Sequence, residues 1–338
     1  MKQALRGAAF FLADLLGANL LFRWINAGEI RILMYHGISS ARLPSFYWTR
    51  LDLKEFMRQM KHVRRHYHVA AVSSLVQPGS GSPDSKRNVV MISFDDGYEN
   101  IYREAWPVLM NLNLRAACFV LPNLSEKGEI IWTDRLYDII MSNAGMDLDL
   151  TRFALGKFHL SNDPEECARI CATISRTLKA WPCEKKDAVI RFFHDNCQSG
   201  KINNNEFRLM TAEQIRELAR SKEFEIGAHT NNHSILSTLT PAEQEKEISE
   251  SVRLLREWGI EPIPIFAYPN GAPGDFDEHS IAILKRMNFK SAFSTIDGFH
   301  DKRDDNFSVR RIPVGADMSE WEFRARLSGF YYFIRRFV

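Results

Sequence analysis

Short apolar runs alternate with amphipathic segments along most of the chain. The apolar runs lie at 30–36, 67–72, 89–94, 115–122, 224–228, 264–268 and 308–314. Several are apolar at nearly every position, which is typical of strands buried on both faces. Apolar residues recur every three or four positions at 52–65, 98–112, 211–221 and 240–258, which predicts helices. Strands that alternate with helices predict parallel βαβ units and a barrel-like or doubly wound α/β core.

Residues 126–208 interrupt this alternation. Their pattern is mostly helical, with long runs at 163–181 and 184–197, and it has little strand character. We interpret the segment as a helical insertion between two strands of the core. Because it leaves the core at the carboxyl end of a strand, we expect it near any site at that end. Trp132 and Asp134, at its start, are candidates for the pocket wall, with a packing role as the alternative for Trp132.

Two adjacent carboxylates follow the apolar run at 89–94. Asp95 and Asp96 stand where this strand is expected to end, immediately before Gly97. Ligands of α/β folds bind at the carboxyl ends of strands. Neighbouring carboxylates repel each other unless a cation or a proton relieves the charge. The alternative is a polar turn, for which Asp-Asp-Gly is equally suitable.

Two histidines follow the apolar run at 224–228. His229 and His233 are four residues apart, a spacing at which two imidazoles can face one metal ion. Such a pair alone is more often surface or core than ligand. With a carboxylate from the pair at 95–96, however, the imidazoles complete a three-ligand site that leaves one position open for water.

The SFDDG segment at 93–97 and the HTNNH segment at 229–233 resemble the motifs of the polysaccharide deacetylases. These NodB-homology enzymes of the carbohydrate esterase family 4 type remove N-acetyl groups from amino sugars. The resemblance extends roughly over 30–314. It implies a distorted (β/α) barrel across 29–328, with the insertion at about 126–208.

The resemblance also implies roles for the motif residues. Asp95 takes the place of the general base, and the metal ligands are Asp96, His229 and His233. Two imidazoles and one carboxylate suit Zn²⁺, although Co²⁺, Ni²⁺ or Fe²⁺ fits the same donors.

The first apolar run ends in Tyr35-His36. This opening resembles that of a circularly permuted branch of the family, typified by exopolysaccharide deacetylases. The resemblance implies that His36 is the general acid that protonates the leaving amine. Taken by itself, His36 is an ordinary histidine at the end of a strand.

The FAYPNG segment at 266–271 resembles the family segment that helps to bind the oxyanion. The resemblance makes the Asn270 N–H the oxyanion donor. The residues assigned to substrate binding are Tyr268, Pro269, Gly271 and Trp132. Ala267 stands where the family commonly has an arginine that orients the base. Arg310 or Arg311 is a candidate substitute, with an ordinary strand-edge charge as the alternative.

Both ends of the chain combine aromatic and basic residues. Residues 1–28 are mostly apolar, but the interval between Arg6 and Arg23 is shorter than the about 20 residues that span a bilayer. We predict a helix in a membrane interface, inserting the aromatic side chains of Phe10, Phe11, Phe22 and Trp24. The alternatives are a helix packed on the protein's own surface and an uncleaved signal anchor. The tail at 329–338, with Arg335 and Arg336, repeats this composition.

Composition and charge limit the possible partners and the cellular compartment. The chain has 338 residues, 45% hydrophobic and 25% charged, as in an ordinary globular protein. The net charge of +2 offers no reason to expect nucleic acid as a partner. The five cysteines show no pairing pattern and suggest buried, reduced thiols. With the apolar termini, this predicts a peripheral protein of the bacterial inner membrane, on its cytoplasmic face.

Together these features predict a metal-dependent amide hydrolase of surface-polysaccharide biosynthesis. The expected substrate is an N-acetylhexosamine, either in a polysaccharide or in a lipid-linked glycan intermediate. A deformylase of a lipid-linked formamido sugar and a hydrolase of a non-sugar amide are alternatives, because the site does not distinguish short acyl groups. A non-catalytic glycan-binding subunit is another. A metal phosphoesterase is disfavoured, because it typically requires two ions.

Overall fold

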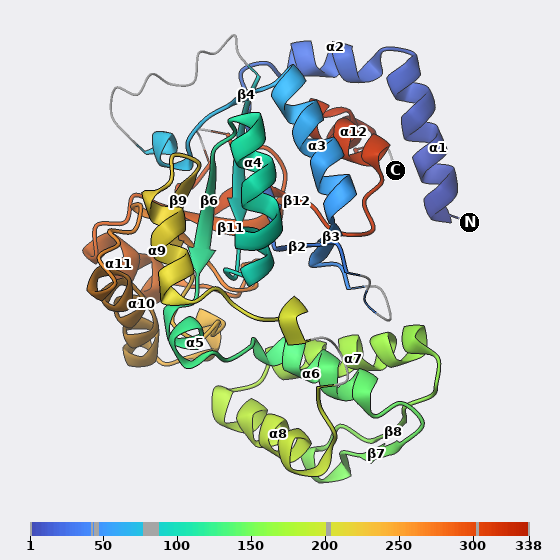
Figure 1. Cartoon of the computed structure of the whole chain (residues 1–338), viewed down its shortest axis with the longest axis vertical. Coiled ribbons are helices and arrows are strands. Elements are labelled where there is room, and N and C mark those ends of the chain that lie inside the picture. The colour runs from blue at the N-terminus through green and yellow to red at the C-terminus, as the bar shows by residue number, and fades with distance from the viewer. Residues whose placement is uncertain are drawn as a thin grey trace.

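Parallel strands close into a barrel at the centre of the computed structural model (Figure 1). The structure describes residues 2–41, 43, 47–76, 88–200, 204–301 and 304–336. The seven strands of the barrel, in spatial order, are β1 (Ile30–Tyr35), β12 (Val309–Pro313), β11 (Ser291–Asp297), β10 (Ile265–Ala267), β9 (Phe224–Ala228), β6 (Ala116–Val120) and β5 (Val89–Phe94), which pairs again with β1. All of these pairings are parallel, so all the carboxyl ends lie at one rim. The expected distorted (β/α) barrel is confirmed. The short strand β4 (His68–Val69) pairs with β5 from outside this ring.

The register of the strands brings the motif residues together. Tyr35 pairs with Phe94, so the next residues, His36 and Asp95, leave neighbouring strands side by side. The Asp95 N–H donates to the Tyr35 carbonyl at 2.9 Å. On the far side of β5, β6 pairs in turn with β9, whose last residue is followed by His229.

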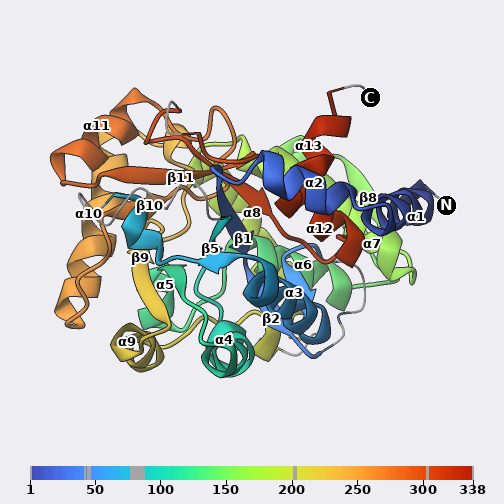
Figure 2. The same ribbon diagram turned by 90° about the horizontal axis from the view of Figure 1, so that it is seen from above.

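Helices cover the outside of the barrel (Figures 1 and 2). They are α3 (Leu53–His66), α4 (Trp106–Leu112), α5 (Pro122–Lys127), α9 (Ala212–Arg220), α10 (Pro241–Glu257) and α11 (Glu278–Arg286). The predicted capping box of α10 is present, with both of its hydrogen bonds. The helix predicted over 98–112 is present from residue 99, with a π-helical turn at 101–105 before α4. Pro107 has no N–H to donate to residue 103, which disfavours regular α-helical bonding there.

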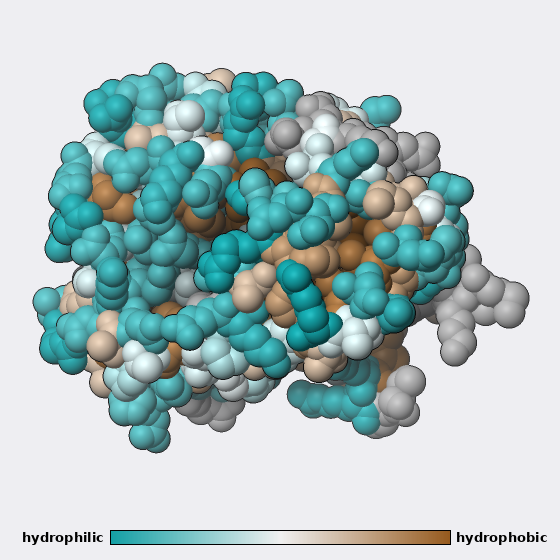
Figure 3. All heavy atoms as spheres, turned by 90° about the horizontal axis from the view of Figure 1, so that it is seen from below, coloured by the Kyte–Doolittle hydropathy of each residue, from teal (hydrophilic) through white to brown (hydrophobic). Residues whose placement is uncertain are grey.

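The helical insertion lies below the barrel, at the rim to which the arrow of β6 points (Figure 1). Its elements are α6 (Trp132–Ser142), β7 (Asp147–Asp149), β8 (Lys157–His159), α7 (Pro164–Lys179) and α8 (Cys183–Asn196). The antiparallel pair β7–β8 was not predicted. The insertion has an apolar core of its own, which includes the free thiols of Cys167 and Cys171. From this side the surface is mostly hydrophilic, with apolar residues gathered in a few patches (Figure 3).

The N-terminal segment forms two helices, so the prediction of one helix is wrong. Gly17, in the left-handed conformation at φ 81°, separates α1 (Lys2–Leu15) from α2 (Ala18–Ile25). Both helices contact α12 (Glu320–Ser328) near the C-terminus (Figure 2).

The aromatic residues of the two ends pack against each other. In the tail, α13 (Phe330–Ile334) brings Phe330 within 6.5 Å of Phe10 and 5.3 Å of Phe22, measured between ring centroids. Phe10 is buried, so its predicted insertion into a membrane is wrong. Its apolar surface is already covered by the protein's own C-terminal helices.

Leucines, one tryptophan and one isoleucine form the exposed apolar surface of α1 and α2. We call this surface the apolar ridge; its members are more than half exposed and comprise Leu12, Leu15, Leu16, Leu20, Leu21, Trp24 and Ile25. In the described part of the chain, no single helix is long and apolar enough to cross a bilayer. The pair Gly7–Leu15 and Ala18–Ile25 reaches that length and apolarity only when both parts are counted, and it is bent by 78°.

A buried arginine joins the two ends of the chain to the barrel. Arg31, in β1, donates hydrogen bonds to the carbonyls of Leu327, Glu29 and Asn26 at 2.6–2.7 Å. Its side chain is fully buried, and burial lowers the pKa of Arg31 to about 10. Because two of these carbonyls lie at the ends of α2 and α12, the cation also interacts favourably with the negative ends of the helix dipoles.

We predict that Arg31→Met destabilises the protein, because three carbonyls lose a charged donor. The expected loss in the free energy of unfolding is about 3 kcal/mol, measured by urea denaturation. Arg310→Met removes an exposed arginine as the matched control and should cost less than about 1 kcal/mol. Equal losses for the two variants would contradict a special role of Arg31.

Candidate active site

A cavity of about 730 Å³ lies between the barrel rim and the insertion. The predicted site residues on its wall are His36, Asp95, Asp96, His229, His233, Asn270 and Trp132. They come from segments far apart in the sequence, and the barrel gathers them at one rim. The volume lies within the range typical of ligand-binding pockets.

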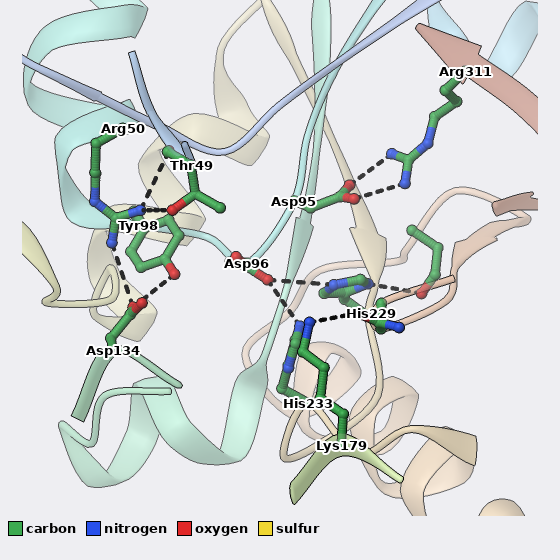
Figure 4. A network of polar contacts seen from close by, with 12 residues as sticks. Thr49, Arg50, Asp95, Asp96, Tyr98, Asp134, Lys179, His229, His233 and Arg311 are labelled. Atoms are coloured by element: carbon green, nitrogen blue, oxygen red, sulfur yellow. Dashed lines mark hydrogen bonds and ion pairs between the residues drawn. The ribbon is translucent and has the colours of Figure 1, made fainter. Parts of the chain in front are cut away.

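Asp96 and the two histidines form a candidate metal centre (Figure 4). The Nε2 atoms of His229 and His233 lie 3.4 and 3.3 Å from Asp96 Oδ1. Tetrahedral coordination with bonds of about 2.0–2.2 Å places neighbouring ligand atoms roughly 3.3–3.5 Å apart. Asp96 Oδ1 is buried and has no hydrogen-bond partner within the described residues. The donor set, its spacing and this unpaired oxygen all fit one divalent cation.

A backbone carbonyl orients the ring of His229. His229 Nδ1 donates to the Ala267 carbonyl at 2.7 Å, since a carbonyl can only accept. That bond leaves the Nε2 lone pair free for a metal.

Left-handed backbone angles occur at Asp96, Thr230, His233 and Asn270. Such conformations are costly outside glycine and cluster at functional sites.

Arg311 fixes the candidate base. Its Nη1 and Nη2 donate to the two carboxylate oxygens of Asp95 at 2.7 and 2.6 Å, and the guanidinium is fully buried (Figure 4). Burial raises the pKa of Asp95, but the Arg311 charge and hydrogen bonds hold that pKa below its ordinary value. Of the two candidate substitutes, Arg311 therefore orients Asp95. Arg310 is exposed and lies 3.4 Å from Asp304.

His36 lines the cavity and packs against an aromatic ring. Its ring contacts Trp48 edge to face, with 5.0 Å between centroids. Burial lowers the pKa of His36, although Asp96 and Asp95 act in the opposite direction. Within the described residues, its Nδ1 has no hydrogen-bond partner.

Asn270 is held by both its side chain and its backbone. Lys179 Nζ, from α7 of the insertion, donates to Asn270 Oδ1 at 2.6 Å, and Asn270 Nδ2 donates to Asp275 at 2.5 Å. The Asn270 carbonyl accepts from Thr295 Oγ1 at 2.7 Å. In the part of the chain that the structure describes, no acceptor pairs with the Asn270 N–H.

Three predicted substrate contacts lie off the cavity wall. Pro269 and Gly271 flank Asn270 without lining the cavity, and Tyr268 is buried, stacked on Phe276 with 4.0 Å between centroids. Direct contact of Tyr268 with substrate is therefore contradicted, because its ring packs into the barrel core. Trp132 both lines the cavity and packs against the apolar cores of barrel and insertion.

A second buried network connects the insertion to the barrel. Asp134, in α6, accepts a hydrogen bond from Tyr98 at 2.7 Å and lies 3.4 Å from Arg50 (Figure 4). It also accepts a hydrogen bond from Tyr47 at 2.5 Å. Burial raises the pKa of Asp134 despite these partners. Asp134 lines the cavity, as predicted, but the sequence did not indicate this network. Its partners lie too far away in the chain to be inferred from local patterns.

Comparison with known proteins identifies the family. The family model described as "Polysaccharide deacetylase" matches residues 82–173 and 182–292. The chain belongs to the polysaccharide deacetylase family. It is therefore an N-deacetylase, a hydrolase of carbohydrate amides. The matched ranges contain Asp95, Asp96, His229, His233 and Asn270, and leave His36 and Arg311 outside.

Individual relatives agree with this assignment. The chain is 22% identical to "Putative polysaccharide deacetylase YxkH" of Bacillus subtilis, over 89% of this chain and 78% of that protein. Its fold is similar to that of the Streptococcus pyogenes deacetylase PplD in complex with acetate (TM-score 0.59, 18% identity, 89% of this chain and 99% of that one). It is also similar to a de-N-acetylase from Aggregatibacter actinomycetemcomitans (TM-score 0.54, 16% identity, 88% and 99%).

We predict that the purified protein binds one divalent cation per chain at this centre. His229→Ala and Asp96→Asn should lower metal content at least about tenfold, because each removes one of three ligands. Metal is measured by inductively coupled plasma mass spectrometry after dialysis. His159→Ala, on the surface of the insertion, is the matched control. Full metal content in both site variants would place the cation elsewhere.

Proposed function

We propose that this deacetylase removes the N-acetyl group from an N-acetylhexosamine of a polysaccharide or of a lipid-linked glycan intermediate in surface-polysaccharide assembly. The observation that carries the proposal is a bidentate, buried Asp95–Arg311 pair next to a three-donor metal centre in one cavity. Amide hydrolysis needs a base near an activated water, and this arrangement provides both. A non-catalytic binding subunit would need neither an oriented base nor a complete donor set.

The residues of the chain divide the reaction between them. Asp96, His229 and His233 would hold a divalent cation, for which these donors favour Zn²⁺. When bound, the cation supplies Lewis acidity that polarises an amide carbonyl and makes water more acidic. Asp95 is held ionised by Arg311, so it can accept the proton of the attacking water. The Asn270 N–H would donate a hydrogen bond to the oxyanion that forms during the reaction. His36, when protonated, would transfer its proton to the leaving amine.

We further propose that the protein docks on a membrane surface through the apolar ridge. Contiguous exposed apolar surface of this kind marks interaction sites in soluble proteins. Arg335 follows α13, which contacts α2; its guanidinium lies 3.4 Å from Asp297 but is mostly exposed, so it is available to anionic headgroups. We propose the cytoplasmic face of that membrane, because free thiols such as Cys118 and Cys167 suit a reducing compartment.

We predict that the metal-loaded enzyme releases acetate from N-acetylated glycan and that Asp95→Asn lowers kcat at least about 100-fold by removing the base. Mass spectrometry detects the product as the loss of one acetyl group. Asp95→Asn should keep its metal, because Asp95 is outside the donor set. A near-normal rate in this variant would remove the base assignment.

We predict that the protein floats with vesicles of phosphatidylethanolamine and phosphatidylglycerol. The triple variant Leu16→Ser, Leu20→Ser, Trp24→Ser should bind at least about tenfold more weakly, since each large apolar side chain contributes roughly 1.5–3 kcal/mol on burial. Met110→Ser changes an exposed apolar residue on α4 and serves as control. Wild-type protein that stays in the lipid-free fraction would refute membrane docking.

A further inference from the structure

One face of helix α7 forms a wall of the cavity opposite the barrel rim. The charged residues that it contributes are Glu165, Arg169, Arg176 and Lys179. Their spacing of three, four and seven residues places them along one side of a helix. This face therefore presents three cationic side chains and one carboxylate to the space in which a substrate must lie.

Lys179 is already engaged at the inner end of this face. Its ammonium group donates to Asn270, which in turn donates to Asp275. It therefore serves to position the Asn270 turn, and we assign it to the catalytic machinery.

Arg169 and Arg176, unlike Lys179, have no side-chain partner among the residues described. Both are exposed to the cavity, and neither forms an ion pair with a carboxylate among the residues described. In contrast, other arginines of the site are neutralised, Arg311 by Asp95 and Arg50 by Asp134. With Glu165 as the one carboxylate on this face of α7, the wall keeps a net positive charge towards the cavity.

The spacing of the two arginines suits one anionic group. At a rise of 1.5 Å per residue, their Cα atoms are about 10.5 Å apart along the helix. Two extended arginine side chains can approach a single group from its two sides across that gap. The planar guanidinium matches phosphate and carboxylate in two-point hydrogen bonding, whereas a neutral sugar offers only hydroxyl groups.

We infer that Arg169 and Arg176 form a subsite for an anionic group, phosphate or carboxylate, carried by the substrate next to its acylated hexosamine. The inference rests on the proposed deacetylation, which it deepens by naming the chemistry of the neighbouring unit. A phosphate would come from the linkage to a lipid carrier, and a carboxylate from an acidic sugar of a polysaccharide.

The test compares three substrates that share an N-acetylglucosamine. They are the neutral methyl glycoside, the 1-phosphate and a disaccharide with glucuronic acid. Wild-type enzyme should show a kcat/KM at least about tenfold higher for one of the anionic substrates, through a lower KM, because charged hydrogen bonds are worth more than neutral ones. The preferred anion identifies the source. Added salt should reduce this preference, because the arginines are exposed.

The variant Arg169→Gln, Arg176→Gln should lose this preference and retain its rate on the methyl glycoside. Arg191→Gln removes one exposed charge from α8, outside the cavity, and should leave the preference intact. An unchanged preference in the double variant, or no preference in the wild type, overturns the subsite while hydrolysis of the methyl glycoside leaves the proposed function standing.

A binding measurement separates the two proposals further. Isothermal titration calorimetry of the metal-loaded Asp95→Asn variant with N-acetylglucosamine 1-phosphate requires no turnover. Affinity should fall about tenfold or more when Arg169 and Arg176 are also changed to glutamine. Equal affinities overturn the subsite. Failure of the wild type to release acetate from any of the three substrates, with this binding difference present, would count against the proposed function alone.

Discussion

Two imidazole nitrogens and a carboxylate oxygen converge in a buried site, and the rest of the structure is organised around that convergence. Among the described residues, Asp96 Oδ1 is buried without a hydrogen bond, which is costly, and a cation at the centre would compensate its charge. The closed parallel barrel makes the convergence possible, because it brings strand ends from distant parts of the chain to one rim. Gly97 is required beside it, since its φ is 76° and a Cβ would lie 3.0 Å from Val120.

The insertion completes a site that the barrel only begins. Lys179 fixes the turn at Asn270, and Asp134 ties α6 to Tyr98 next to the aspartate pair. In this account the barrel carries out the catalysis and the insertion selects the substrate. The barrel carries the proposed base, metal donors and acid, whereas α7 of the insertion places charged side chains on the opposite wall of the cavity.

Local patterns predicted parallel βαβ units and the residues at their strand ends, whereas the choice of a distorted barrel came from the motif resemblance. Asp95, Asp96, His229 and His233 each follow an apolar run directly, so their place at the rim follows from where the strands end. The partner of Asp95 was left between Arg310 and Arg311, because alternation along β12 does not say which of the two faces inward. Lys179 and Trp48 were missed as site residues, since only the docking of distant segments brings them to the cavity.

At the two ends of the chain, composition predicted a helix but not its packing partners. Composition indicated an apolar N-terminal helix correctly, but Gly17 was not recognised as a break, and the aromatic residues were assigned to lipid. Phe10 and Phe22 instead meet Phe330, because the tail folds back onto them. Elements with weak apolar patterns, such as α12 and β11, were not predicted, since tertiary packing rather than periodicity determines them.

The central claim is that one cation lies among Asp96, His229 and His233. The most direct measurement is anomalous diffraction at the zinc absorption edge from crystals of the zinc-loaded protein. The account predicts one strong peak at bonding distance, about 2.0–2.2 Å, from the Asp96 carboxylate and from both Nε2 atoms. A peak bound elsewhere, or imidazoles turned away from Asp96 with no peak between them, would contradict it.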